Sequence, residues 1–137
     1  MGRRDVLILG STSQFYRYLG VGVVTTVFGY GAIFFCMYVL HWGPFLSNIV
    51  IYSVAIVCSY FLNRNFTFQS SGEWRPEALK FFGVFLLAYA ANFGVLKFLI
   101  NAGVHEGASQ VIASGFYVMI SFSANKFHVF KTQADRY

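Results

Sequence analysis

The chain has 137 residues, of which 57% are hydrophobic and only 11% are charged, and its formal net charge is +5. A soluble domain of this size exposes much of its surface, and so few charged side chains do not keep that surface hydrated. The composition therefore excludes an ordinary soluble enzyme and predicts an integral membrane protein. The basic residues flank apolar runs instead of forming a separate face, so we expect membrane anchoring and no binding of nucleic acid.

Long apolar runs account for this composition, and each is close to the roughly 20 residues that an α-helix needs to cross a bilayer. We expect a short tail over residues 1–14 and helices over about 15–40, 45–61, 79–100 and 108–127. The runs predict one all-α membrane domain that covers residues 1–137. Because four helices make a thin wall for any transport path, we also expect a homo-oligomer. The small residues of the first helix would allow close approach of a partner helix; they are Gly20, Gly22, Thr26 and Gly29.

The distribution of basic residues predicts how the helices are oriented. All but one of the lysines and arginines fall on the side of the two termini and of the middle loop, near residues 69–77. Only Lys97 lies toward the other side. Since basic residues are enriched on the cytoplasmic side of membrane proteins, we expect both termini and the middle loop to be cytoplasmic.

The two halves of the chain end on a similar phrase. Segments 63–68 (NRNFTF) and 125–130 (NKFHVF), which we call the closing motifs, each begin with Asn and a cation and end with Phe. Residues 17–21 align with residues 80–84 at an offset of 63, and the final Phe residues align at an offset of 62. The spacing predicts two repeats of two helices, about 15–68 and 79–131, in the same orientation. The alternative is convergence: two helix pairs of separate origin resemble each other because both satisfy the same requirements for crossing a membrane.

No pattern typical of an enzyme is present. The sequence has no nucleotide-binding Gly-Lys-Ser/Thr loop, no clustered His and Cys, and no plausible Ser-His-Asp set, so we expect no catalytic residue, metal or cofactor. A small-molecule exporter driven by protons is also disfavoured, because such pumps use an acid inside the membrane. Every acid lies outside the expected helices; these are Asp5, Glu73, Glu77, Glu106 and Asp135.

One cation stands at the cytoplasmic end of each expected helix. Together these four residues could hold the phosphate of an anionic lipid, Arg by paired donors and Lys as a point charge. The neighbouring Asn63 and Asn125 would add neutral donors. The alternative for each single cation is that it extends to the headgroups and marks topology. The four cations are Arg17, Arg64, Lys80 and Lys126.

Polar residues within the apolar runs predict a translocation groove. Lys97 would serve as an outer phosphate station, or it would only extend to the outer surface. The asparagines would line the groove or form hydrogen bonds between helices, and the tyrosines would face a sugar or only pack. The candidate groove residues are Asn48, Tyr60, Tyr89, Asn92, Lys97 and Tyr117.

The segments 15–22 (FYRYLGVG), with Thr25, and 60–68 (YFLNRNFTF) resemble the GtrA-like family of small four-helix membrane proteins. The resemblance covers about residues 15–131. The phrase Asn-Arg-x-Phe/Trp-Thr-Phe is its most specific part, and Phe66 stands where many relatives carry Trp, which keeps an aromatic anchor.

This resemblance implies a function. Members of the family are proposed to translocate, or flip, a polyprenyl-phosphate-linked sugar from the cytoplasmic to the outer leaflet for O-antigen or other cell-surface polysaccharide glycosylation. It further implies a multi-pass protein of the bacterial inner membrane and a partner glycosyltransferase. The alternative is a scaffold without transport activity that recruits the glycosyltransferase.

Overall fold

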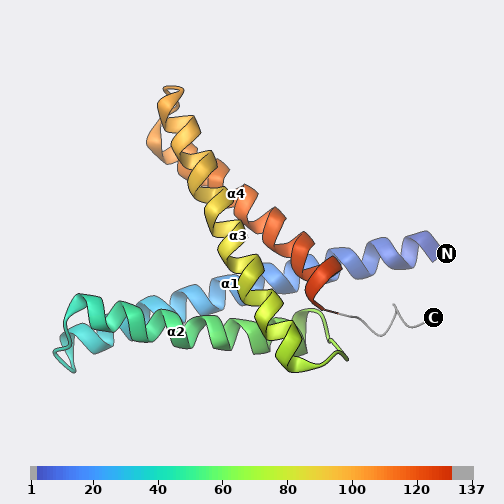
Figure 1. Ribbon diagram of the computed structural model, residues 1–137, viewed down its shortest axis with the longest axis horizontal. Helices are drawn as coiled ribbons and strands as arrows, with labels where there is room; N and C mark the ends of the chain where they lie inside the picture. Colours follow the sequence, from blue (N-terminus) through green and yellow to red (C-terminus); the bar gives the residue numbers. More distant parts are fainter. Residues whose placement is uncertain (1–2, 131–137) are drawn as a thin grey trace. The chain divides into compact units, whose positions relative to one another are not determined.

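The computed structural model describes residues 3–130, with side chains from Gly10 onward. The described residues form helices joined by short connections, without a strand, and the prediction of an all-α four-helix membrane protein is confirmed (Figure 1). In chain order the elements are α1 (Arg3–Tyr38), α2 (Pro44–Leu62), the π-helical turn η1 (Asn63–Thr67), α3 (Trp74–Asn101), α4 (Glu106–Ala124) and the π-helical turn η2 (Asn125–Val129).

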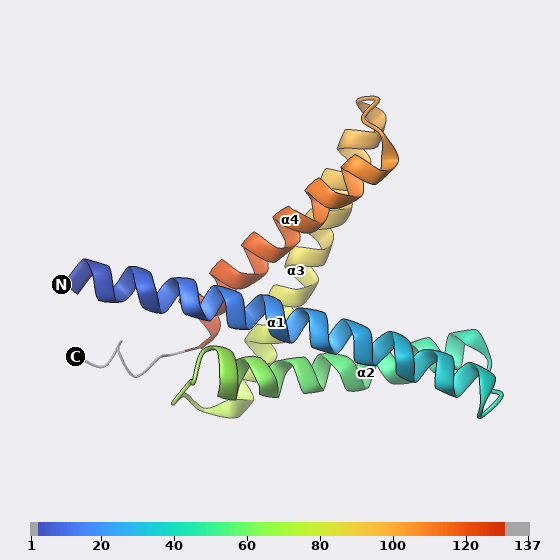
Figure 2. The same ribbon diagram turned by 180° about the vertical axis from the view of Figure 1, so that it is seen from behind.

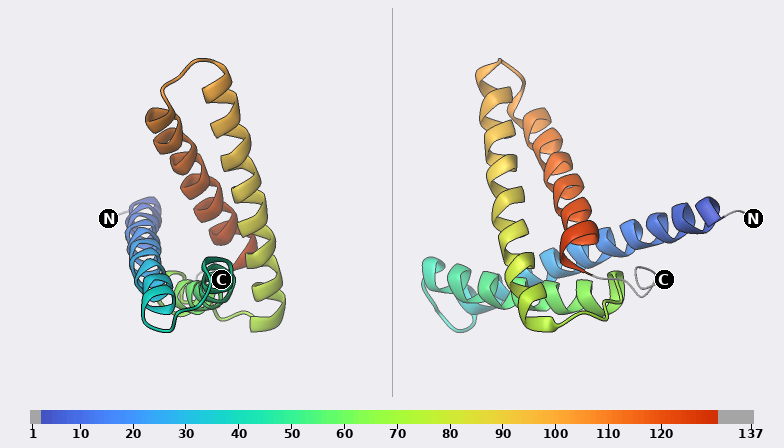
Figure 3. Two further views of the ribbon diagram at one scale, coloured as in Figure 1. Left: turned by 90° about the vertical axis from the view of Figure 1, so that its left-hand side faces the viewer. Right: turned by 45° about the vertical axis from the view of Figure 1, so that its right-hand side comes forward.

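The chain divides into two compact units, Met1–Gln69 and Ser70–Tyr137. In the first, α1 and α2 lie side by side and antiparallel, and we call this unit the first hairpin (Figures 1 and 2). In the second hairpin, α3 and α4 pair in the same way (Figure 3). Each hairpin is therefore a pair of long helices joined by a short turn, at residues 39–43 and 102–105.

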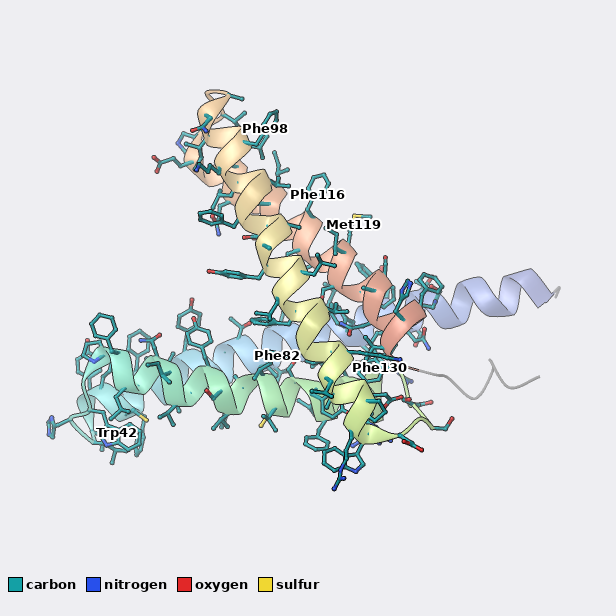
Figure 4. All side chains as sticks on the ribbon, viewed as in Figure 1. Trp42, Phe82, Phe98, Phe116, Met119 and Phe130 are labelled. Carbon is teal, nitrogen blue, oxygen red and sulfur yellow. The ribbon has the colours of Figure 1, made fainter. Side chains whose placement is uncertain are left out.

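The helices present apolar side chains outward, as a surface facing lipid requires. Phe98 and Met119 point away from the second hairpin and are 71% and 67% exposed (Figure 4). Trp42 lies in the turn of the first hairpin, where an interfacial aromatic is expected. Among the described residues, three segments are long and apolar enough to cross a bilayer: Gly10–Tyr38, Pro44–Thr67 and Trp74–Asn101. α4 is as long as α2, but its serines and Gln110 lower its hydropathy.

Two expected helix starts were wrong. α1 begins at Arg3 instead of residue 15, because residues 3–14 continue the same helix ahead of the long apolar run. α3 begins at Trp74 instead of residue 79, and Pro76 lies in its first turn, where its missing N–H costs nothing. The second and fourth helices give way to π-helical turns at Asn63 and Asn125. Lys131, Asp135 and Arg136 of the expected basic tail lie outside the described residues.

The helix bounds follow the offsets between the two halves. α1 ends at Tyr38 and α3 ends 63 residues later at Asn101, whereas α2 and α4 begin 62 residues apart and are both 19 residues long. The one-residue difference falls in the turns. The first turn places His41 at a φ of 56°, and the second places Gly103 at 83°, a conformation that glycine adopts without strain. The common orientation of the two hairpins in the membrane stays a prediction.

Candidate functional site

Each closing motif forms a π-helical turn that folds its final phenylalanine back onto the first helix of its hairpin. The N–H of Phe68 donates to the carbonyl of Asn63 at 2.8 Å, and that of Phe130 donates to Asn125 at 2.9 Å. The ring of Phe68 then lies 6.2 Å from that of Tyr18, and both Phe68 and Phe130 are at most 2% exposed. In the second hairpin the Phe81 and Phe130 rings are 6.0 Å apart. Single π-helical turns are rare and concentrate at functional sites.

The asparagine that opens each motif is buried and bonded within its own hairpin. The side-chain amide of Asn63 donates to the carbonyl of Ser59 at 2.9 Å and lies 3.3 Å from its hydroxyl, while Asn125 bonds the hydroxyl of Ser121 at 3.4 Å. Both asparagines are at most 2% exposed, and the Oδ1 atom of each is buried without a partner. Both side-chain amides therefore donate within their own hairpin, and their donation to a lipid phosphate stays a proposal.

The first hairpin brings two arginines to its closing motif. The guanidinium of Arg17 lies 5.3 Å from the centre of the Phe66 ring and donates to the Phe66 carbonyl at 3.3 Å. Arg64, at the start of the motif, donates to Oδ1 of Asn65 at 3.3 Å. Both arginines are half-buried. Arg17 thus satisfies one backbone carbonyl of the closing motif, and Arg64 lies just beyond the C-terminal end of α2, where a cation is favoured by the helix dipole.

The second hairpin has two lysines near its own closing motif. Lys80 precedes Phe81, the partner of Phe130, and its side chain is exposed. Lys126 is half-buried, with its Nζ atom 5.9 Å from the Phe122 ring and 5.6 Å from the Phe127 ring. Each hairpin therefore carries a pair of cations beside its closing motif. Binding of one phosphate by all four cations stays a proposal.

The candidate groove residues lie in both hairpins. In the first, Asn48 donates to the carbonyl of Pro44 at 2.8 Å within its own helix, and Tyr60 is only 5% exposed. In the second, Asn92 and Tyr117 are half-buried on α3 and α4, whereas Tyr89 is 60% exposed. Lys97 is exposed and lines a shallow hollow near the C-terminal end of α3, with Phe93, Leu96, Ile100 and Asn101. A groove that joins all six residues stays a proposal.

A hollow between α1 and α2 was not expected from the sequence. Its volume is about 210 Å³. Gly29 and Ala55 line it from the two helices, and at the same offsets the second hairpin carries Asn92 and Tyr117. A comparison of the two halves position by position would have shown this difference. The full lining consists of Val24, Thr25, Phe28, Gly29, Ala32, Ile51, Val54, Ala55, Cys58 and Leu62.

One acid expected before the third helix, Glu77, is buried in the structure. Because α3 begins early, Glu77 falls in its first turn, where a carboxylate is stabilised by the helix dipole, and it is only 4% exposed. The hydroxyl of Ser70 donates to its Oε1 atom, and the N–H of Gly72 donates to the Ser70 hydroxyl at 3.2 Å. Gly72 leaves the space that the carboxylate fills. Among the described residues, no three His, Cys, Asp or Glu side chains are grouped as metal ligands.

The sequence is similar to known proteins over most of its length. The model of the GtrA/DPMS transmembrane domain matches residues 17–130. The chain is 27% identical to the cell wall teichoic acid glycosylation protein GtcA of Listeria monocytogenes, covering 86% of this chain and 85% of the relative. It is 29% identical to a bactoprenol-linked glucose translocase of Shigella flexneri, with 88% and 94% covered, and 32% identical to one of Salmonella phage P22, with 80% and 81% covered.

The matched region begins at Arg17 within α1 and ends at Phe130, so it contains α2, α3, α4 and both closing motifs in full. The apolar helices make this a multi-pass membrane protein, and the resemblance seen in the sequence is confirmed. The chain belongs to the family of the GtrA/DPMS transmembrane domain.

Proposed function

We propose that this protein translocates a polyprenyl-phosphate-linked sugar from the cytoplasmic to the outer leaflet of a bacterial inner membrane. The observation that carries the proposal is the pair of cations beside each closing motif, in a chain similar to relatives named bactoprenol-linked glucose translocases. The lipid-linked sugar would serve the glycosylation of a cell-surface polymer, as in the relatives named for teichoic acid glycosylation.

The phosphate would dock first, on the cytoplasmic side. Arg64 and Lys126 directly follow the buried asparagines. The backbone of each π-helical turn therefore fixes the position from which the cationic side chain extends. Hydrogen bonds between a charged donor and a phosphate are about twice as strong as neutral ones, and they resist competition by water at a membrane surface. Arg17 and Lys80 would complete the set of cations.

The head group would then pass along the polar residues toward Lys97. Asn92 and Tyr117 are half-buried on the two helices of the second hairpin, and Asn48 and Tyr60 would extend the path on the first. Tyr89 would offer its exposed ring to the sugar. The described helices contain no nucleotide-binding motif that would supply energy for the step. The proposed transport therefore runs down the concentration gradient of the lipid-linked sugar.

The test uses purified protein in liposomes with a radiolabelled polyprenyl-phosphate glucose, and leaflet exchange is measured. Arg64→Ala and Lys126→Ala should each slow exchange about tenfold, since one hydrogen bond to a charged group contributes about 1.5–3 kcal/mol. Arg75→Ala is the matched control: it removes an exposed cation that stacks on Trp74 at 5.3 Å, outside the set of four. Normal exchange by both variants would eliminate the docking role of the cations.

One observation favours the scaffold function as a second candidate. Trp74 is 53% exposed beside Arg75 at the start of α3, so the segment before this helix presents an aromatic and a cation to a partner. Trp and Arg are enriched among the residues that dominate protein interfaces. Absence of leaflet exchange by the wild-type protein, together with binding of a membrane glycosyltransferase that Trp74→Ala abolishes, would support this function instead.

A further inference from the structure

We infer that the hollow between α1 and α2 binds the isoprenoid tail of the lipid-linked sugar beside its phosphate. This inference rests on the proposed translocation function, and it assigns the two hairpins different parts of one substrate. The first hairpin would hold hydrocarbon, and the second would face the polar head group.

The lining of the hollow fits hydrocarbon and rejects a sugar. Its only hydroxyl belongs to Thr25, and that hydroxyl donates to the carbonyls of Val21 at 2.8 Å and Gly22 at 3.1 Å within its own helix. A sugar placed there would lose its hydrogen bonds to water without replacement, which is costly. The volume of about 210 Å³ exceeds the roughly 150 Å³ of an engineered apolar cavity that binds benzene, so one branched isoprene unit fits.

The hollow begins just beyond the cation pair of the same hairpin. Val24 follows Arg17 by seven residues, or about 10 Å along the helix, and Leu62 directly precedes the closing motif that carries Arg64. A lipid whose phosphate is held by these arginines therefore has its first isoprene units at the depth of the hollow. The small side chains of Gly29, Ala32 and Ala55 leave room for the methyl branches that distinguish an isoprenoid from an acyl chain.

The second hairpin carries a polar side chain at two of the ten positions that match this lining. Asn92 takes the place of Gly29, and Tyr117 takes the place of Ala55, so a bulky or polar side chain stands where the first hairpin has space. Both are half-buried on paired helices. These two exchanges make the second hairpin more polar than the first at the matching positions.

The first experiment maps the tail directly, with the full-length protein in liposomes of phosphatidylethanolamine and phosphatidylglycerol. The probe is a polyprenyl phosphate with a photoreactive diazirine near its phosphate, and its comparison is a straight-chain alkyl phosphate with the diazirine at the same distance. We expect the isoprenoid probe to label residues 24–32 and 51–62, and unlabelled polyprenyl phosphate, but not alkyl phosphate, to compete. Equal labelling by both probes would show bulk lipid in the hollow and overturn the inference.

The second experiment fills the hollow. Gly29 lines the hollow, and a Cβ atom added there meets nothing within 4 Å, so Gly29→Leu adds volume at the lining and its first carbon has room. Loss of contact with roughly two methylene groups is enough to weaken binding about tenfold, and we expect photolabelling by the isoprenoid probe to fall by that factor. Gly31→Leu is the control, because Gly31 lies outside the lining, is exposed and also has nothing within 4 Å of an added Cβ. Unchanged labelling in Gly29→Leu would overturn the tail site.

Leaflet exchange measured in the same liposomes separates the two proposals. Isoprenoid labelling of the hollow without any exchange would refute translocation and leave the tail site standing. Exchange without labelling of the hollow would refute the tail site alone. Crosslinks that instead join the hollow to another segment of this chain, or to a second copy, would show that protein covers it, and would also overturn the inference.

Discussion

The guanidinium of Arg17 lies over the ring of Phe66 and donates to the carbonyl of the same residue at 3.3 Å. This contact ties α1 to the closing motif of the first hairpin. At the matching positions the second hairpin carries Lys80 and His128, both exposed. Lysine has neither the planar fork nor the stacking face of arginine, so the two hairpins hold their first cation differently.

We therefore expect Phe66→Leu to weaken the first hairpin modestly while all four cations remain. An exposed cation–π contact contributes about 0.5–1 kcal/mol, and thermal unfolding in detergent should show a loss of that size. Phe66→Trp should retain wild-type stability, because Trp offers the best ring for such a contact. Equal unfolding temperatures for Phe66→Leu and Phe66→Trp would show that the ring contributes nothing to the hairpin.

The final phenylalanines of the closing motifs should contribute far more to stability. Phe68 is 1% exposed against Tyr18, and Phe130 is 2% exposed against Phe81. Removal of a buried phenylalanine side chain costs about 3–5 kcal/mol, so Phe68→Ala and Phe130→Ala should each lower the unfolding temperature strongly. Phe127→Ala is the matched control from the same motif, because Phe127 is 73% exposed. A control as destabilised as the two buried variants would contradict this account.

Much of the fold could be predicted from the sequence, because its apolar runs have the length that a bilayer demands. The helix pairs and their closing motifs follow from those runs and from the cations after them. The π-helical turns could not be predicted, since a shift of one residue in hydrogen bonding leaves composition unchanged. Only the matched Asn63 and Asn125, each five residues before a phenylalanine, mark these turns in the sequence.

The positions of the charged residues in the candidate site could be predicted from the sequence, but the burial of its side chains could not. Cations at helix ends are visible as sequence positions, and the structure brings Arg17 to the closing motif of its hairpin. Burial of Glu77 depends on Ser70 and Gly72 folding back, which is a tertiary contact without a sequence pattern. The hollow beside Gly29 likewise exists only because two helices meet there.

Residues 70–72, which we call the linker, contact α3, and this contact gives a third prediction. Gly72→Ala should destabilise the protein by about 1–3 kcal/mol, because its methyl group would overlap the buried carboxylate of Glu77 and force it to move. Gly83→Ala on α3 is the control, since an added Cβ there meets nothing within 4 Å. Thermal unfolding of the purified variants would measure the difference. If Gly72→Ala and Gly83→Ala unfold at the same temperature, the linker does not hold Glu77 in place.

The orientation of the hairpins gives the last prediction. Glu73, before α3, and His105, before α4, are both exposed and lie at opposite ends of the same helix, so cysteines at these positions report on opposite faces of the membrane. In a background with Cys36→Ala and Cys58→Ala, a membrane-impermeant maleimide added to intact spheroplasts should label His105→Cys and leave Glu73→Cys unlabelled until the membrane is permeabilised. The positive-inside bias around the middle segment is the physical reason. Labelling of Glu73→Cys from outside would reverse the orientation and place the cations of the second hairpin on the wrong side to receive a cytoplasmic phosphate.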